Sequence, residues 1–164
     1  MKFIPTSRAM VVNDAMKLIA DNYRLIIISI NEESGVDFNP PTGLPNVSVP
    51  MLTLNFADIS RRVGNHKMFD EIMSNQIFFF VDIQKNADIC LVHCHAGVSR
   101  SPAVCAGLSL HYNKKCDEYF EKYEPNLLVF YRMVEQSYKL KTKRHYLWKF
   151  GQFRAILSSD GRVC

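Results

Sequence analysis

The chain has 164 residues, of which 48% are hydrophobic and 22% charged, with a formal net charge of +4. This composition suits one globular domain over residues 1–164 and excludes a repeat or low-complexity protein. No stretch approaches the roughly 20 apolar residues that span a bilayer, and the first residues lack the hydrophobic run of a secretion signal, so we expect a soluble cytoplasmic protein.

Short apolar runs alternate along the chain with segments of helical periodicity. Strands are expected at Lys2–Ile4, at Leu25–Ile30, within Val47–Phe56 and at Ile89–His93. Helical spacing of apolar residues occurs over Val12–Ile19, His66–Val81 and Leu127–Val134, and Pro102 favours a further helix that starts after Ser101 and runs to about Tyr112. Residues 31–49 contain three prolines and two glycines and are expected to form an irregular loop. Strands that alternate with helices predict an α/β three-layer sandwich, with a mostly parallel central sheet flanked by helices.

The most informative segment is His93–Ser101, which reads H-C-x5-R-S between a predicted strand and a predicted helix. Ligands of such sheets bind beyond the carboxyl ends of the strands. Between Cys94 and the guanidinium of Arg100, a run of backbone N–H groups can surround a tetrahedral dianion. These phosphate-binding positions are His95, Ala96, Gly97, Val98, Ser99 and Arg100. A phosphate monoester is the expected ligand.

The same segment suits covalent catalysis. A cysteine close to a helix N-terminus and an arginine is ionised at neutral pH, so we expect Cys94 to act as a thiolate nucleophile. Arg100 can bind two phosphoryl oxygens with its planar fork. The attack would form a phosphocysteine that water then hydrolyses. Ser101 is expected to donate a hydrogen bond to the sulfur, and His93 to order the loop.

His93–Ser101 resembles the active-site loop of the cysteine-dependent protein tyrosine phosphatase superfamily, and the chain length is similar to that of its compact dual-specificity branch. Leu54–Ile59 resembles the segment that carries the general acid in small bacterial and phage members, and Pro125–Leu128 resembles the start of a later helix there. The resemblance implies that Cys94 is the nucleophile, Arg100 the phosphate clamp and Ser101 the leaving-group helper. It implies no metal or organic cofactor.

Asp58 is the predicted general acid, because it follows a predicted strand and precedes a loop that can reach over a pocket. The alternative is that Asp58 caps a helix or turn. Asp70 and Asp82 fall within and near the end of a helical pattern and are expected to be ordinary surface acids. The Trp-Pro-Asp sequence of the large tyrosine-specific enzymes is absent, so the resemblance supports Asp58 less strongly than Cys94.

Cys90, His93, Cys94 and His95 lie within six residues, which raises the question of a metal site. Zinc ligands usually form two separated pairs, and no second pair stands out, so we expect no metal. The five cysteines show no paired spacing, as expected for a reducing compartment.

The predicted function is hydrolysis of phosphotyrosine in a protein substrate, with phosphoserine or phosphothreonine as further substrates. Two alternatives remain: an RNA 5′-triphosphatase, and a non-catalytic module that binds phosphorylated partners.

Residues 139–164 carry seven Lys or Arg against one acid, so this basic extension has a net charge of +6, and residues 1–138 have a net charge of −2. Its aromatic residues either pack on the domain or help it to contact RNA or an anionic surface weakly. Arg61 and Arg62 either recruit acidic substrates or are simply solvated.

Overall fold

Four parallel strands form the central sheet of the computed structural model, which describes residues 1–33 and 49–142. The strands are β1 (Lys2–Ser7), β2 (Leu25–Asn31), β3 (Met51–Asn55) and β4 (Ile89–Cys94), in the order β1-β4-β2-β3. Every strand pair in the described residues is parallel. The two central strands, β2 and β4, are buried along their whole length, as their apolar runs require.

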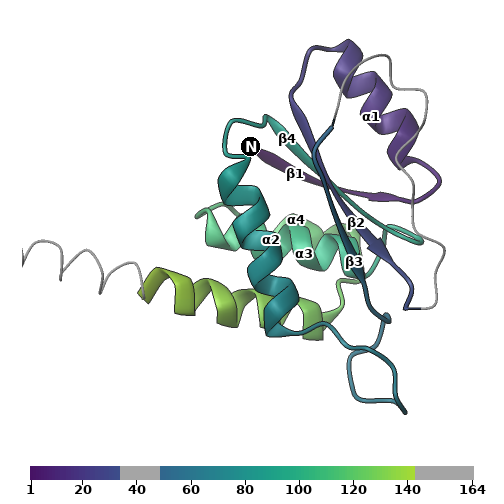
Figure 1. The fold of residues 1–164 in the computed structure, drawn as a ribbon, viewed down its shortest axis with the longest axis vertical. Helices are drawn as coiled ribbons and strands as arrows, with labels where there is room; N and C mark the ends of the chain where they lie inside the picture. The colour runs from purple at the N-terminus through teal and green to yellow at the C-terminus, as the bar shows by residue number, and fades with distance from the viewer. Residues whose placement is uncertain (34–48, 143–164) are drawn as a thin grey trace, which may run out of the picture.

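Helices cover both faces of this sheet (Figure 1). On one face lies α1 (Val11–Ala20), which packs on Leu25 and Ile27. On the other lie α2 (Glu71–Ile83), α3 (Arg100–His111), α4 (Asp117–Lys122) and the helical residues 127–142. Alternate residues of β2, Ile26 and Ile28, point into this larger cluster, because successive side chains of a strand face opposite ways. The predicted three-layer α/β sandwich is therefore confirmed.

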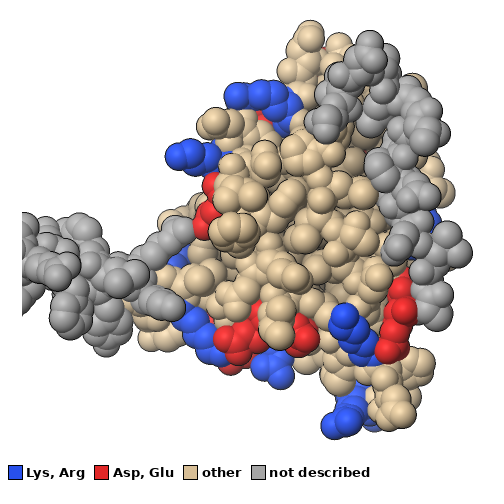
Figure 2. Space-filling model, viewed as in Figure 1, with Lys and Arg blue, Asp and Glu red and all other residues tan. Residues whose placement is uncertain are grey.

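The helix α3 lies at the centre of the larger layer and is buried almost all round. Helical residues 127–142 cross it so closely that a Cβ atom on Gly107 would lie 2.4 Å from Cβ of Met133. Charged side chains line the lower edge of the molecule, below α2, whereas the middle of the same face is largely uncharged (Figure 2). Lys139, in the helical residues 127–142 (here called the long helix), forms ion pairs with Glu71 and Glu135.

The elements differ from the predicted ones in several details. The strand β1 runs to Ser7 rather than Ile4, and the helix expected over Leu127–Val134 covers residues 127–142. The helix α2 begins at Glu71 rather than near His66, because the side chain of Asp70 caps it by accepting a hydrogen bond from the Met73 N–H at 2.9 Å. The short helix α4 was not predicted. The strand β4 continues through Cys94, where the sequence indicated a loop.

Two predicted features fall outside the described residues: most of the irregular loop at residues 31–49, and residues 143–164 of the basic extension. Within residues 1–33 and 49–142, no helix is long and apolar enough to cross a membrane.

Candidate active site

The predicted site residues meet at the carboxyl edge of the sheet. There β4 ends at Cys94 and α3 begins at Arg100, so the five residues between them form a short loop, here called the catalytic loop (residues 95–99). Because all described strands are parallel, the last residues of β1, β2 and β3 lie at the same edge. This is where α/β sheets bind ligands.

The Cys94 thiol is 2% exposed and lies among donors. Its Sγ is 3.3 Å from the N–H of Gly97 and 3.3 Å from Oγ of Ser101. Gly97 has a φ of +80°, and a Cβ atom there would lie 2.8 Å from the backbone of Thr6 and of Ser7. The catalytic loop therefore rests directly on the end of β1, and this approach admits only glycine.

The other cysteines of the described residues have different surroundings. Cys90 and Cys105 are fully buried in the apolar core, and this burial raises the pKa of both thiols. Desolvation also raises the pKa of the half-buried Cys116. These thiols are protonated at neutral pH, and Cys94 is the one that lies at the N-terminal end of α3.

Arg100 is buried and fixed by groups at the ends of two strands, β2 and β3. Its Nη1 donates to the backbone oxygens of Phe56 at 2.8 Å and Asn31 at 3.3 Å, and its Nη2 donates to the carboxylate of Glu32. Its Nε is buried without a hydrogen-bond partner and lies 3.6 Å from Oδ2 of Asp58. An N–H donor thus remains for a phosphoryl oxygen.

Asp58 lies beside the catalytic loop. Its Oδ1 accepts hydrogen bonds from Oγ of Ser99 at 2.9 Å and from Nδ2 of Asn126 at 2.8 Å. Asp58 caps none of the helices in the described residues. By contrast, Asp70 caps α2, and Asp82 accepts a hydrogen bond from the Tyr112 hydroxyl at 2.7 Å.

Asn126 forms hydrogen bonds with the segment that carries Asp58 (Leu54–Ile59, here called the acid segment), with the catalytic loop and with the first turn of the long helix. Besides its bond to Asp58, its backbone N–H donates to Ser99 O at 3.1 Å. Its Oδ1 accepts from the N–H of Val129 at 3.2 Å, which caps the helical residues 127–142. The Pro125–Leu128 segment therefore begins a helix, as expected, and also supports the site.

His93 points to the α1 side of the sheet, away from the Cys94 thiol, because neighbouring residues of a strand face opposite ways. Its imidazole is fully buried. Burial and the charge of Arg8 lower the pKa of His93 to about 4, and a hydrogen bond with the Cys94 backbone opposes them in part. His93 is consequently neutral at pH 7.

Glu32, Asn31, Asn126 and Arg8 were not singled out from the sequence, although each contacts the site. The sequence signal that could have identified Glu32 and Asn31 was their place at the end of a buried strand.

Arg61 and Arg62 are exposed, and no acid in the described residues pairs with them. Cys90 and Cys94 share one face of β4 with His93 on the other, and the described residues contain no group of three His, Cys, Asp or Glu that could hold a metal ion.

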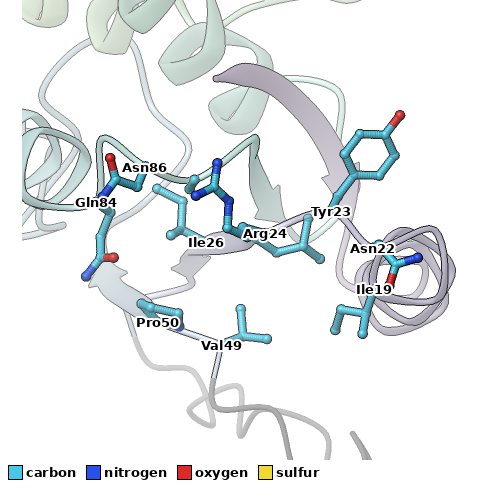
Figure 3. Close-up of a pocket in the computed structure, with 11 residues that line it drawn as sticks. Ile19, Asn22, Tyr23, Arg24, Ile26, Val49, Pro50, Gln84 and Asn86 are labelled. Carbon is cyan, nitrogen blue, oxygen red and sulfur yellow. The ribbon is translucent and has the colours of Figure 1, made fainter.

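A separate cavity of about 390 Å³ lies at the opposite, amino edge of the sheet (Figure 3). It is bounded by the loop between α1 and β2, by the residues before β3, and by the end of α2. Arg24 on its wall forms an exposed ion pair with Asp88 at 3.0 Å. Because Cys94 ends β4 at the other edge, this cavity is not part of the candidate active site.

The fold is similar to that of several phosphatase structures. Human DUSP28 matches with a TM-score of 0.58 and 16% identity, covering 86% of this chain and 94% of that chain. The human tyrosine phosphatase-like serine/threonine/tyrosine-interacting protein matches with a TM-score of 0.57 and 18% identity, covering 87% and 91%. PTPMT1 in complex with PI(5)P matches with a TM-score of 0.51 and 19% identity, covering 87% and 91%.

No protein-family model and no curated protein sequence matches the chain. The structural matches establish that the chain has the dual-specificity phosphatase fold, which confirms at the level of fold the resemblance inferred from His93–Ser101. The resemblance to bacterial and phage members stays a prediction.

Proposed function

We propose that the protein is a cysteine-dependent phosphatase that hydrolyses phosphotyrosine, and also phosphoserine or phosphothreonine, through a phosphocysteine intermediate. The observation that carries this proposal is the placement of Cys94 Sγ. It lies 3.3 Å from a backbone N–H and 3.3 Å from a hydroxyl, just before the helix α3, whose first residue is the buried Arg100. Such surroundings place hydrogen-bond donors on the sulfur and favour an oxyanion ligand next to it.

In the first step, the Cys94 thiolate attacks phosphorus. A P–S bond forms as the P–O bond to the leaving group breaks. Arg100 and the N–H groups of the catalytic loop hold the three non-bridging oxygens, whose charge they offset. Asp58, in its protonated form, gives its proton to the departing oxygen.

In the second step, water attacks the phosphocysteine. The P–S bond breaks and its electron pair returns to sulfur, while the Asp58 carboxylate takes the proton from water. The hydroxyl of Ser101, 3.3 Å from Sγ, donates a hydrogen bond that stabilises the departing thiolate. Phosphate is then released from the catalytic loop.

The fold supports a phosphatase more strongly than it supports a particular substrate. Among the similar structures, one is named as phosphatase-like and interacting, and one holds a phosphoinositide. A binding module and a lipid phosphatase therefore compete with the protein phosphatase. The RNA 5′-triphosphatase alternative depended on the basic extension, most of which lies outside the described residues.

The decisive experiment is hydrolysis of p-nitrophenyl phosphate in the presence of EDTA. We expect turnover by the wild type and none by Cys94→Ser, because serine at this position is not ionised at neutral pH. Cys116→Ser is the matched control, since its thiol is half-buried at the start of α4, where a serine hydroxyl can reach water, and should leave the rate within about twofold. Absence of turnover by a folded wild type at every pH would favour the binding module.

Substrate choice is tested by comparing kcat/KM on phosphotyrosine peptides, PI(5)P and triphosphate-ended RNA. We expect phosphotyrosine peptides to be preferred. A higher kcat/KM on PI(5)P, or faster release of the γ-phosphate from RNA, would contradict the protein substrate while leaving the phosphocysteine mechanism intact.

A further inference from the structure

Arg8 is a second guanidinium beside the catalytic loop. It follows β1, and its backbone N–H donates to the carbonyl oxygens of Cys94 at 2.9 Å and His95 at 3.2 Å. Its Nη2 donates to Oδ1 of Asn31 at 2.7 Å, at the end of β2. Because β4 lies between β1 and β2 in the sheet, the Arg8 side chain crosses the end of the strand that carries Cys94.

The crossing brings its charge close to the anion site. Neighbouring strands are about 4.8 Å apart, so a side chain that spans from β1 to β2 passes within roughly one strand spacing of the end of β4. Alternation along β2 and β4 puts Asn31 and His93 on the α1 side, and the hydrogen bond to Asn31 brings the Arg8 guanidinium to that side, whereas the Cys94 thiol faces the α3 side. Arg8 therefore lies behind the catalytic loop and does not occupy the phosphoryl position.

The charge of Arg8 lacks an acidic partner. The side chain is half-buried, its Nε is buried without a hydrogen-bond partner, and no carboxylate of residues 1–33 or 49–142 lies within ion-pair distance. The nearby acids are engaged elsewhere, Asp14 by the Thr6 hydroxyl and Glu32 by Arg100. A partly buried cation is costly without a counter-charge, and an anion bound at the catalytic loop would supply one.

Arg8 and Arg100 both donate hydrogen bonds to Asn31. The Asn31 side chain accepts from Arg8, while its backbone oxygen accepts from Arg100 Nη1 at 3.3 Å. Asn31 is fully buried, and its Nδ2 donates to Oδ1 of Asn55 at 3.3 Å, so it cannot easily shift. After burial, the charge of Arg8 is the second cause that lowers the pKa of His93 on β4.

We propose that Arg8 is a positioning residue of the phosphate site, a second cation behind the catalytic loop that strengthens the binding of phosphoryl dianions and supports Arg100 through Asn31. This inference deepens the proposed function and rests on it for the identity of the ligand. It adds a charge that the H-C-x5-R-S sequence does not contain.

The test separates charge from hydrogen bonding. Arg8→Lys keeps the cation, whereas Arg8→Gln keeps an N–H donor for Asn31 without the charge. Binding of inorganic phosphate is measured by calorimetry at low ionic strength, which needs no turnover. We expect Arg8→Gln to weaken phosphate binding roughly tenfold and Arg8→Lys to remain within about threefold of wild type. Arg132→Gln, an exposed cation that pairs with Glu135, is the matched control and should change nothing.

Two outcomes would overturn the inference: phosphate affinity unchanged in Arg8→Gln, or an equal loss in Arg8→Gln and Arg8→Lys, which would assign the effect to geometry alone. If Arg8→Gln does not fold, Asn31→Asp supplies a carboxylate that neutralises Arg8, and its phosphate affinity should fall by a similar factor. If wild type binds phosphate but turns over no substrate, the proposed function fails and the role of Arg8 is still decided.

Discussion

In the proposed mechanism, the carboxyl group of Asp58 gives a proton to the leaving group. Replacing this carboxyl group should therefore lower the rate most for substrates with poor leaving groups. Asp58→Asn keeps the oxygen that accepts from Ser99 and Asn126 but cannot donate the proton. We expect kcat/KM on phenyl phosphate to fall by about 10²–10³, and on p-nitrophenyl phosphate by much less. The measurement is kcat/KM across a series of aryl phosphates with graded leaving groups.

Asp70→Asn is the matched control for this series, because asparagine also caps a helix and α2 should be unaffected. A loss in Asp58→Asn that is the same for every leaving group would remove Asp58 from the proton transfer. It would leave Asp58 a structural role in holding Ser99.

The contact of Gly97 with the end of β1 gives a second prediction for a single residue. Gly97→Ala adds a Cβ atom 2.8 Å from the Thr6 and Ser7 backbone at a φ of +80°. Left-handed strain of about 1–2 kcal/mol and overpacking of about 1–3 kcal/mol should both lower the free energy of unfolding, measured in urea. Activity should also fall, because the loop must move away from β1.

Gly64→Ala is the control for backbone strain alone. Gly64 has a φ of +53°, but a Cβ atom there would meet nothing within 4 Å. We expect it to cost only about 1–2 kcal/mol and to leave turnover largely unchanged. Equal losses in the two variants would mean that close packing on β1 is not what requires glycine at position 97.

At the scale of elements, the start of the long helix and the acid segment depend on one side chain. Asn126→Ala removes a cap, which costs about 1 kcal/mol, and also removes the donor to Asp58. Asn126→Ser restores a cap but is too short to reach Asp58. We therefore expect serine to recover stability in urea but not kcat on poor leaving groups, and recovery of both would mean that Asn126 acts only on the helix.

The elements themselves were largely predictable because their signals are local. Buried parallel strands require continuous apolar runs, and Leu25–Ile30 and Ile89–His93 supply them. The start of α2 was wrong by several residues because apolar spacing extends upstream of the residue that caps the helix, Asp70. The helix α4 has only six residues and buries only Tyr119, so it has almost no periodicity to detect.

At the scale of the whole molecule, Asp58 was predicted from its place after a strand, and the rest of the predicted site is contiguous in sequence. Cys94, Arg100 and Ser101 belong to one loop, and their proximity follows from the strand–loop–helix order. Other contacts of the site join residues far apart in sequence. Glu32 lies 68 residues before its partner Arg100, and Asn126 lies 68 residues after its partner Asp58. The order of the strands in the sheet brings Glu32 to Arg100, and the packing of the helical residues 127–142 brings Asn126 to Asp58; a single sequence specifies neither.

The free energy of unfolding of the whole molecule should depend on pH, because the imidazole of His93 is buried and neutral. The pKa of His93 is about 4 in the folded protein and about 6.5 in an unfolded chain. Between these values the unfolded state binds more protons, so the free energy of unfolding rises with pH and is lost as pH falls from about 6.5 to about 4. The loss attributable to His93 should approach about 3 kcal/mol.

His93→Gln isolates this contribution, because glutamine does not titrate. Urea unfolding of both proteins at steps between pH 4 and 7.5 should show a pH-dependent loss in wild type that is much smaller in the variant. Carboxylates whose pKa is lowered by ion pairs, such as Asp88 beside Arg24 and Glu135 beside Lys139, titrate alike in both proteins, so their contribution cancels in the comparison. Parallel pH profiles for the two proteins would show that His93 is not held neutral by the fold, and that Arg8 and burial do not act on it as the structure indicates.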